Sequence, residues 1–189
     1  MKNELRIIGG RFRSRKLKFP NAPGLRPTPD RVRETLFNWL RNDIEGARCL
    51  DLYAGSGALG FEAASRGAAK VVLVERDAAV CKALERNRAL LNAEAVDVIQ
   101  ADTERFLSGT GQPFDVVFLD PPFREGLVVP CCRVLEENGW LSPRAKIYVE
   151  AESGLRLLGL PGNWRVLREG KAGEVGYHLY ERMFSGPCS

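Results

Sequence analysis

The chain has 189 residues, 44% of them hydrophobic, which suits one globular domain with a small appendage. No stretch is apolar enough to span a membrane and the start lacks the apolar segment of a signal peptide, so we expect a cytoplasmic protein. Five cysteines without a C-x-x-C pair argue against a disulfide framework or a zinc site, and a single histidine argues against a histidine metal cluster and histidine-based catalysis. The net charge is +4.

The first segment along the chain, residues 1–41, is a basic arm. It holds eleven Lys/Arg against three Asp/Glu, a net charge of +8, which leaves −4 for the remainder. A basic arm on a slightly acidic body suggests a polyanionic partner, although composition alone fits a solvated basic face equally well.

Two kinds of structure are predicted within this arm. The stretch "RIIGGRFRSRKLKFP" (residues 6–20) has short strand-like runs broken by Gly9 and Gly10. In "PTPDRVRETLFNWL" we expect Thr28 to cap a helix with Pro29 at its first position. The apolar face of this helix is predicted to hold Val32, Leu36, Trp39 and Leu40.

Strand-like and helix-like segments alternate from residue 47 onward. Strands are predicted near 48–55, 70–77, 96–102, 114–120 and 145–152, with helices near 58–67, 78–93 and 124–139. This alternation implies parallel strands with right-handed crossovers, hence a doubly wound, Rossmann-like α/β sheet. Residues 163–183 contain two strand-like runs around a glycine turn and predict a C-terminal antiparallel hairpin.

A glycine-rich loop follows the first strand of this sheet. In "LDLYAGSGALG" the residues Gly55, Gly57 and Gly60 satisfy G-x-G-x-x-G, a pattern of nucleotide-binding loops that is weak evidence alone. Glu75 lies 20 positions after Gly55, at the end of the next strand, where an acid can bind ribose hydroxyls.

The acids at the strand ends indicate which nucleotide cofactor fits. A pyrophosphate would meet the carboxylate of Asp51, whereas S-adenosylmethionine (SAM) brings a sulfonium and an ammonium group that a nearby acid favours. Asp102, after the third strand, could accept a hydrogen bond from the adenine amino group. We therefore predict a SAM site with no metal, formed by Asp51, Tyr53, Gly55, Ser56, Gly57, Glu75 and Asp102.

The fourth strand ends in "DPPF", which predicts the methyl-accepting site. Asp120 lies at the topological switch point of the sheet, and Pro121 holds it in an extended conformation. Because neither Pro121 nor Pro122 has an N–H, the loop offers acceptors, which suit an exocyclic amino group. Phe123 supplies a ring for stacking on a flipped-out base. We assign catalysis to Asp120, Pro121 and Phe123 and base binding to Pro122 and Phe123.

With these motifs the chain resembles the class I SAM-dependent methyltransferases that act on exocyclic amines. More closely it is similar to the bacterial 16S rRNA guanine-N2 methyltransferases of the RsmD type. The similarity runs from "RIIGGRFRSRKL" through "LDLYAGSGALGFEAASRGA" and "DPPF" to "AGEVGYHLYER", nearly the whole chain, and "RPTPDRVRETLFN" is its specific part.

The resemblance implies N2-methylation of guanine 966 of 16S rRNA in the small ribosomal subunit or its assembly intermediates, with no membrane partner and a monomeric enzyme. We expect residues 1–41 to dock RNA, residues 42–184 to form the methyltransferase domain and residues 185–189 to be a flexible tail. Phosphate contacts are predicted for seven basic residues: Arg11, Arg13, Arg15, Lys16, Lys18, Arg26 and Arg31.

Other functions stay open on the residues alone. An adenine-N6 or cytosine-N4 methyltransferase of RNA or DNA would use the same "DPPF" loop, because all three bases present an amino group. A non-catalytic RNA-binding assembly factor would keep the fold and the arm. An NAD-dependent oxidoreductase is opposed by Asp51 and by the absence of a proton relay around His178.

Overall fold

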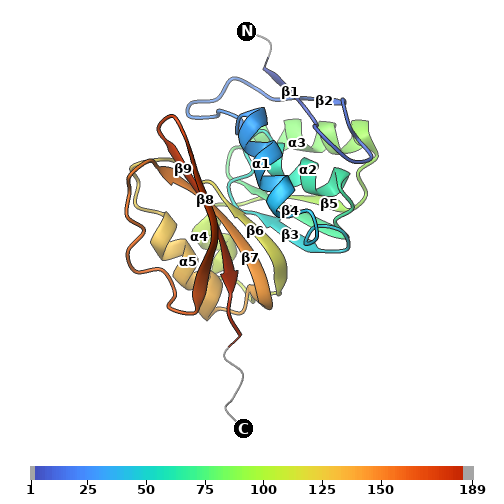
Figure 1. Ribbon diagram of the computed structural model, residues 1–189. Coiled ribbons are helices and arrows are strands. Elements are labelled where there is room, and N and C mark those ends of the chain that lie inside the picture. The colour runs from blue at the N-terminus through green and yellow to red at the C-terminus, as the bar shows by residue number, and fades with distance from the viewer. Residues whose placement is uncertain (1–2, 185–189) are drawn as a thin grey trace.

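The computed structural model describes residues 3–184, so the predicted tail at 185–189 lies outside the described residues. Its centre is a seven-stranded sheet in the order β5-β4-β3-β6-β7-β9-β8 (Figure 1). The strands are β3 (Arg48–Asp51), β4 (Lys70–Glu75), β5 (Val96–Gln100), β6 (Phe114–Leu119), β7 (Leu141–Glu152), β8 (Trp164–Ala172) and β9 (Val175–Arg182).

The pairing of these strands confirms the predicted fold class. The strands β5, β4, β3, β6 and β7 pair in parallel, and β9 pairs antiparallel with both β7 and β8 to form the C-terminal hairpin. The chain passes from β3 outward to β4 and β5 and then returns to β6 on the other side of β3. The ends of β3 and β6 therefore form the switch point where ligands of such sheets bind.

Helices cover both faces of the sheet (Figure 1). They are α1 (Asp30–Trp39), α2 (Ala58–Ser65), α3 (Ala78–Leu91), α4 (Thr103–Leu107) and α5 (Val128–Glu137). The apolar side chains of α1, α2 and α3 share one buried cluster with the sheet, and those of α4 and α5 share another. Because both faces are covered, the parallel strands are almost continuously apolar, which is why the sequence pattern predicts them well.

The basic arm packs directly on this body. Its strands β1 (Glu4–Arg6) and β2 (Lys16–Lys18) pair antiparallel, and Leu5, Ile7, Phe12 and Leu17 are buried in the cluster of α1, α2 and α3. Gly10 has a φ of 74°, and a Cβ there would lie 1.9 Å from the carbonyl oxygen of Ser65. Glycine at this position thus allows the arm to approach α2 closely.

Helix α1 differs from the prediction at its start. Pro29 is the N-cap residue and the helix begins at Asp30, so the predicted cap by Thr28 and the predicted first helical position of Pro29 are both wrong. The Thr28 hydroxyl instead donates a 3.0 Å hydrogen bond to Oε1 of Glu150, a buried partner on β7. Of the predicted apolar face, Val32, Leu36 and Leu40 are buried and Trp39 is half-buried. Within residues 3–184, no helix has the length and hydrophobicity to span a membrane.

Candidate active site

Asp51 lies at the end of β3, against the start of α2. Its side chain is buried, and its Oδ2 accepts a 3.1 Å hydrogen bond from the amide of Gly60. A Cβ on Gly60 would meet a methyl group of Leu73 at 2.1 Å, so only glycine lets α2 pack this closely on the sheet. Burial raises the pKa of Asp51 from 3.8 to about 7, with smaller contributions from Glu75 and Glu150, although the Gly60 amide opposes the rise.

The glycine loop between β3 and α2 adopts conformations that favour glycine. Gly55 and Gly57 have φ values of 51° and 78°. The amide of Gly55 donates a 3.0 Å hydrogen bond to Oε2 of Glu75, and the other oxygen of Glu75 accepts from the amide of Asp77 at 2.9 Å. Glu75 therefore holds the loop to the end of β4, and its contact with a ribose stays a prediction.

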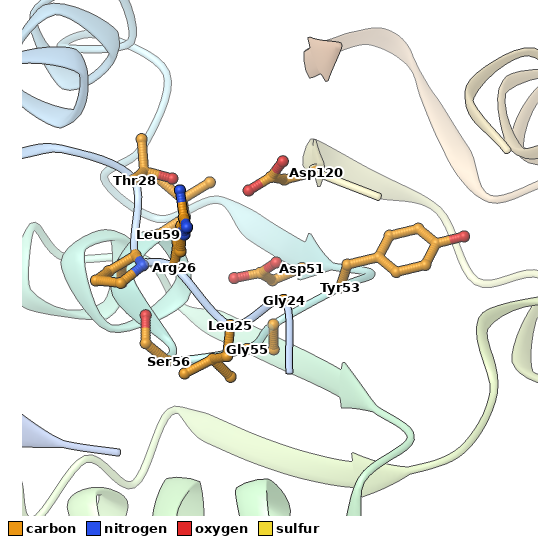
Figure 2. Close-up of a pocket in the computed structure, with 13 residues that line it drawn as sticks. Gly24, Leu25, Arg26, Thr28, Asp51, Tyr53, Gly55, Ser56, Leu59 and Asp120 are labelled. Carbon is orange, nitrogen blue, oxygen red and sulfur yellow. The ribbon is translucent and has the colours of Figure 1, made fainter. Parts of the chain in front are cut away.

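A cavity of about 90 Å³ opens beside this loop (Figure 2). Asp51 and Asp120 direct their carboxylates into it, from the ends of β3 and β6. Its other wall is a segment of the arm, Gly24 to Thr28, which sequence reasoning did not place here. Leu25 lies over Gly55, and the exposed side chain of Arg26 faces the two carboxylates (Figure 2).

Two further predicted cofactor residues, Tyr53 and Ser56, also line this cavity, and Ser56 is buried. The ring of Tyr53 points away from Arg26 (Figure 2), and its hydroxyl lies 3.4 Å from Sγ of Cys131. Asp102 is exposed and caps α4, because its Oδ1 accepts a 2.9 Å hydrogen bond from the amide of Glu104. Its predicted contact with adenine would use the remaining acceptor capacity of that carboxylate.

The "DPPF" loop connects this cavity to a second one. Asp120 lines the first cavity, and Pro121, Pro122 and Phe123 line a neighbouring cavity of about 260 Å³. Pro121 is buried, whereas Phe123 is 37% exposed and accessible for stacking. The pKa of Asp120 is well above its ordinary value because of burial and because Glu150 and Asp51 are close.

Glu150 is an acid of the site that sequence reasoning missed. It is buried on β7, one residue beyond the pair Leu119–Val149, so it lies level with Asp120 on the adjacent strand. Its Oε1 accepts from the hydroxyls of Thr28 and Tyr148, at 3.0 and 2.9 Å. Burial also raises the pKa of Glu150. The available signal was the acid within the apolar run "IYVEA" (residues 147–151), because a glutamate is rarely buried in a strand unless it has a partner.

The predicted RNA-contacting residues are exposed. They comprise Arg11, Arg13, Arg15, Lys16 and Lys18 on the arm, Arg26 at the first cavity and Arg31 on α1. Arg15 donates to the carbonyl of Leu90, and Lys16 pairs with Glu4 at 2.8 Å. Arg33, in contrast, is buried and forms an ion pair with the buried Glu62 at 3.5 Å, so this member of the basic arm supports the fold.

Comparisons with known proteins show the family to which the chain belongs. The family model described as conserved hypothetical protein 95 matches residues 5–181. The curated Ribosomal RNA small subunit methyltransferase D of Escherichia coli is 52% identical over 183 residues, which are 97% of this chain and 92% of that protein. The solved structure of yhhF from Escherichia coli has a TM-score of 0.88 and 50% identity, and covers 96% of this chain and 99% of that one.

A more distant structure shows the fold alone. The RNA methyltransferase from Salinibacter ruber, solved in complex with S-adenosyl-L-homocysteine, has a TM-score of 0.66 at 20% identity over 87% of this chain and 98% of that one. The family match and the close relative cover nearly all of the present chain. The chain therefore belongs to the conserved hypothetical protein 95 family, together with the proteins named Ribosomal RNA small subunit methyltransferase D.

Proposed function

We propose that this protein transfers a methyl group from SAM to the exocyclic N2 of a guanine in 16S rRNA, guanine 966, within the small ribosomal subunit or its assembly intermediates. The observation that carries the proposal is the meeting of Asp51 and Asp120 at one cavity, directly beside the Pro121–Phe123 loop. The names of the curated relatives supply the class of RNA.

The residues of the first cavity fit SAM by their charges. Two carboxylates, Asp51 and Asp120, suit the sulfonium and ammonium groups, and Arg26 suits the carboxylate of the amino-acid end. A cavity of about 90 Å³ holds only that end of the molecule, so we assign the adenosine to the outer side of the glycine loop, near Glu75 and Asp102. SAM, when bound there, supplies an electrophilic methyl group.

Asp120 and the Pro121 carbonyl would hold the accepting amine. Two acceptors that take both amino hydrogens draw the nitrogen toward a tetrahedral geometry and localise its lone pair. Positioning and electrostatics then carry the reaction, because no strong base is needed before transfer. The methylated nitrogen must afterwards lose a proton, and the raised pKa of Asp120 suits that carboxylate to receive it.

The arm would dock the enzyme on RNA, while residues 42–184, together with the arm segment Gly24–Thr28 at the first cavity, would carry the reaction. If Arg11, Arg13 and Lys18 bind phosphates, changing all three to glutamine should weaken RNA binding. The binding constant K for RNA should also fall less steeply with salt: the magnitude of the slope of log K against log salt concentration should decrease by roughly 0.7–0.9 for each phosphate that is no longer neutralised. A matched control changes Arg105, Arg133 and Arg144, which are exposed on α4, α5 and β7, to glutamine. An equal decrease of the slope in both variants would argue against docking by the arm.

The buried Asp51 should make SAM binding pH-dependent. Because folding raises its pKa from 3.8 to about 7, the folded protein keeps a proton that the unfolded chain has lost between these values. The stability of the ligand-free protein therefore falls as pH rises through this window. A bound cation favours the ionised form, so the increase in melting temperature on adding SAM should grow from about pH 6 to about pH 8. Asp51→Asn should reduce this growth, and an increase independent of pH in the wild type would contradict the assignment.

Transfer of labelled methyl groups from SAM tests the proposed function. We expect incorporation into small subunits that lack the modification, with naked 16S rRNA and DNA as parallel substrates. Incorporation into DNA instead would favour a DNA amino-methyltransferase. Tight RNA binding without incorporation into any substrate would favour an assembly factor.

A further inference from the structure

We propose that Glu150 reads the ring N1–H of the target guanine and thereby selects guanine over adenine and cytosine. This inference rests on the proposed function and adds the residue that determines the base. Nothing in the "DPPF" loop makes that choice, because each of the three bases presents the same exocyclic amino group.

The position of Glu150 places a second carboxylate beside the one that would hold the amine. Glu150 lies level with Asp120 on the neighbouring strand, and the two acids are close enough to raise the pKa of Asp120. Glu150 also lines the second cavity, together with Pro121, Pro122 and Phe123. With about 260 Å³, that cavity has room for one flipped-out base.

The hydrogen bonds of Glu150 leave one oxygen available. The hydroxyls of Thr28 and Tyr148 both donate to Oε1 and fix the carboxylate between the arm and the sheet. Within residues 3–184, Oε2 has no hydrogen-bond partner and no basic side chain forms an ion pair with Glu150. Within the described residues, the only fully buried side-chain nitrogen or oxygen without a hydrogen bond is Nη1 of Arg33, so Oε2 of Glu150 keeps some exposure and can accept a hydrogen bond from a donor of the substrate.

The chemistry of the bases determines which substrate brings that donor. Beside its exocyclic amine guanine carries N1–H, a donor, whereas adenine has N1 and cytosine has N3 at that place, and both are acceptors. Two adjacent carboxylates, Asp120 and Glu150, therefore match the two adjacent donors of guanine. An adenine or cytosine in the same place would still offer its amine to Asp120, but it would set the lone pair of a ring nitrogen against Glu150 with no hydrogen between the two acceptors, which strongly disfavours binding.

The test compares guanine with 2-aminopurine at the target position of reconstituted small subunits. 2-Aminopurine keeps the exocyclic amine but has an unprotonated N1. We expect the wild type to methylate guanine roughly 10- to 100-fold faster, the effect of one hydrogen bond to a charged group. Glu150→Gln should lose rate on guanine and reduce this preference severalfold, because the amide of glutamine can donate to N1 of 2-aminopurine.

Tyr148→Phe is the matched control, because it removes one hydroxyl from Oε1 and keeps the carboxylate. Its preference for guanine should stay near that of the wild type, even if its rate falls. An unchanged preference in Glu150→Gln would overturn the inference. Equal rates of the wild type on guanine and 2-aminopurine would overturn it as well, and this second measurement does not depend on the folding of any variant. Wild-type enzyme that methylates neither base would instead overturn the proposed function.

Discussion

Asp120→Ala should lower methyl transfer by roughly a hundredfold or more, because it removes the carboxylate that would hold the accepting amine. SAM binding should change by no more than roughly tenfold, since Asp51, Arg26 and the glycine loop remain. The measurement is single-turnover transfer to small subunits, with SAM affinity from calorimetry. Separate measurement of the two quantities distinguishes loss of reaction from loss of cofactor.

A matched control is Asp115→Ala, on the same strand but at its other end. Asp115 accepts a hydrogen bond from the amide of Arg48 and lines neither of the two cavities described above. Its transfer rate should stay near that of the wild type. A near wild-type rate in Asp120→Ala would refute the role of Asp120 as acceptor for the amine.

Glu62→Ala should lower the free energy of unfolding by about 3–5 kcal/mol, the largest loss of stability that we expect among the variants proposed for this protein. The Glu62 side chain is fully buried and accepts hydrogen bonds from the amides of Ile8 and Gly9 and from Arg66. It is also the buried acid that pairs with Arg33, whose second acidic partner, Asp30, is exposed. Removing it leaves the buried Arg33 charge with the exposed Asp30 as its remaining ion-pair partner, and it leaves the amides of Ile8 and Gly9 without their acceptor.

Denaturant unfolding of Glu62→Ala measures this loss. Asp97→Ala serves as its control, because it breaks an ion pair with Lys70 in which both side chains are substantially exposed. That pair should contribute no more than about 1 kcal/mol. Equal, small losses in the two variants would show that Glu62 is not what attaches the arm to α2.

The sequence predicts the sheet and its switch point well, for a physical reason. Strands buried on both faces must be apolar along their length, so an acid at a strand end, such as Asp51 or Asp120, is conspicuous. Once the strands are known to be parallel, these ends must meet at one edge. The short helix α4 is missed because five residues are too few to show helical periodicity.

Contacts between distant segments are the part that the sequence does not predict. Thr28 and Glu150 are 122 positions apart, and only the folded chain brings the arm across the sheet to join them. The local pattern made Thr28 a helix cap, but a buried carboxylate is the stronger partner for its hydroxyl. Arg33 likewise belongs to the basic arm by composition and to the interior by structure. The same crossing places Leu25 and Arg26 over the glycine loop.

The nucleoside formed by wild-type enzyme tests the central claim most directly. Small subunits that lack the modification are methylated with SAM, and their rRNA is digested and analysed by mass spectrometry. The proposed function predicts N2-methylguanosine, located at a single guanine. N6-methyladenosine or N4-methylcytidine would contradict guanine recognition by Glu150 and the assignment of the substrate, and would leave only the amine-holding role of Asp120.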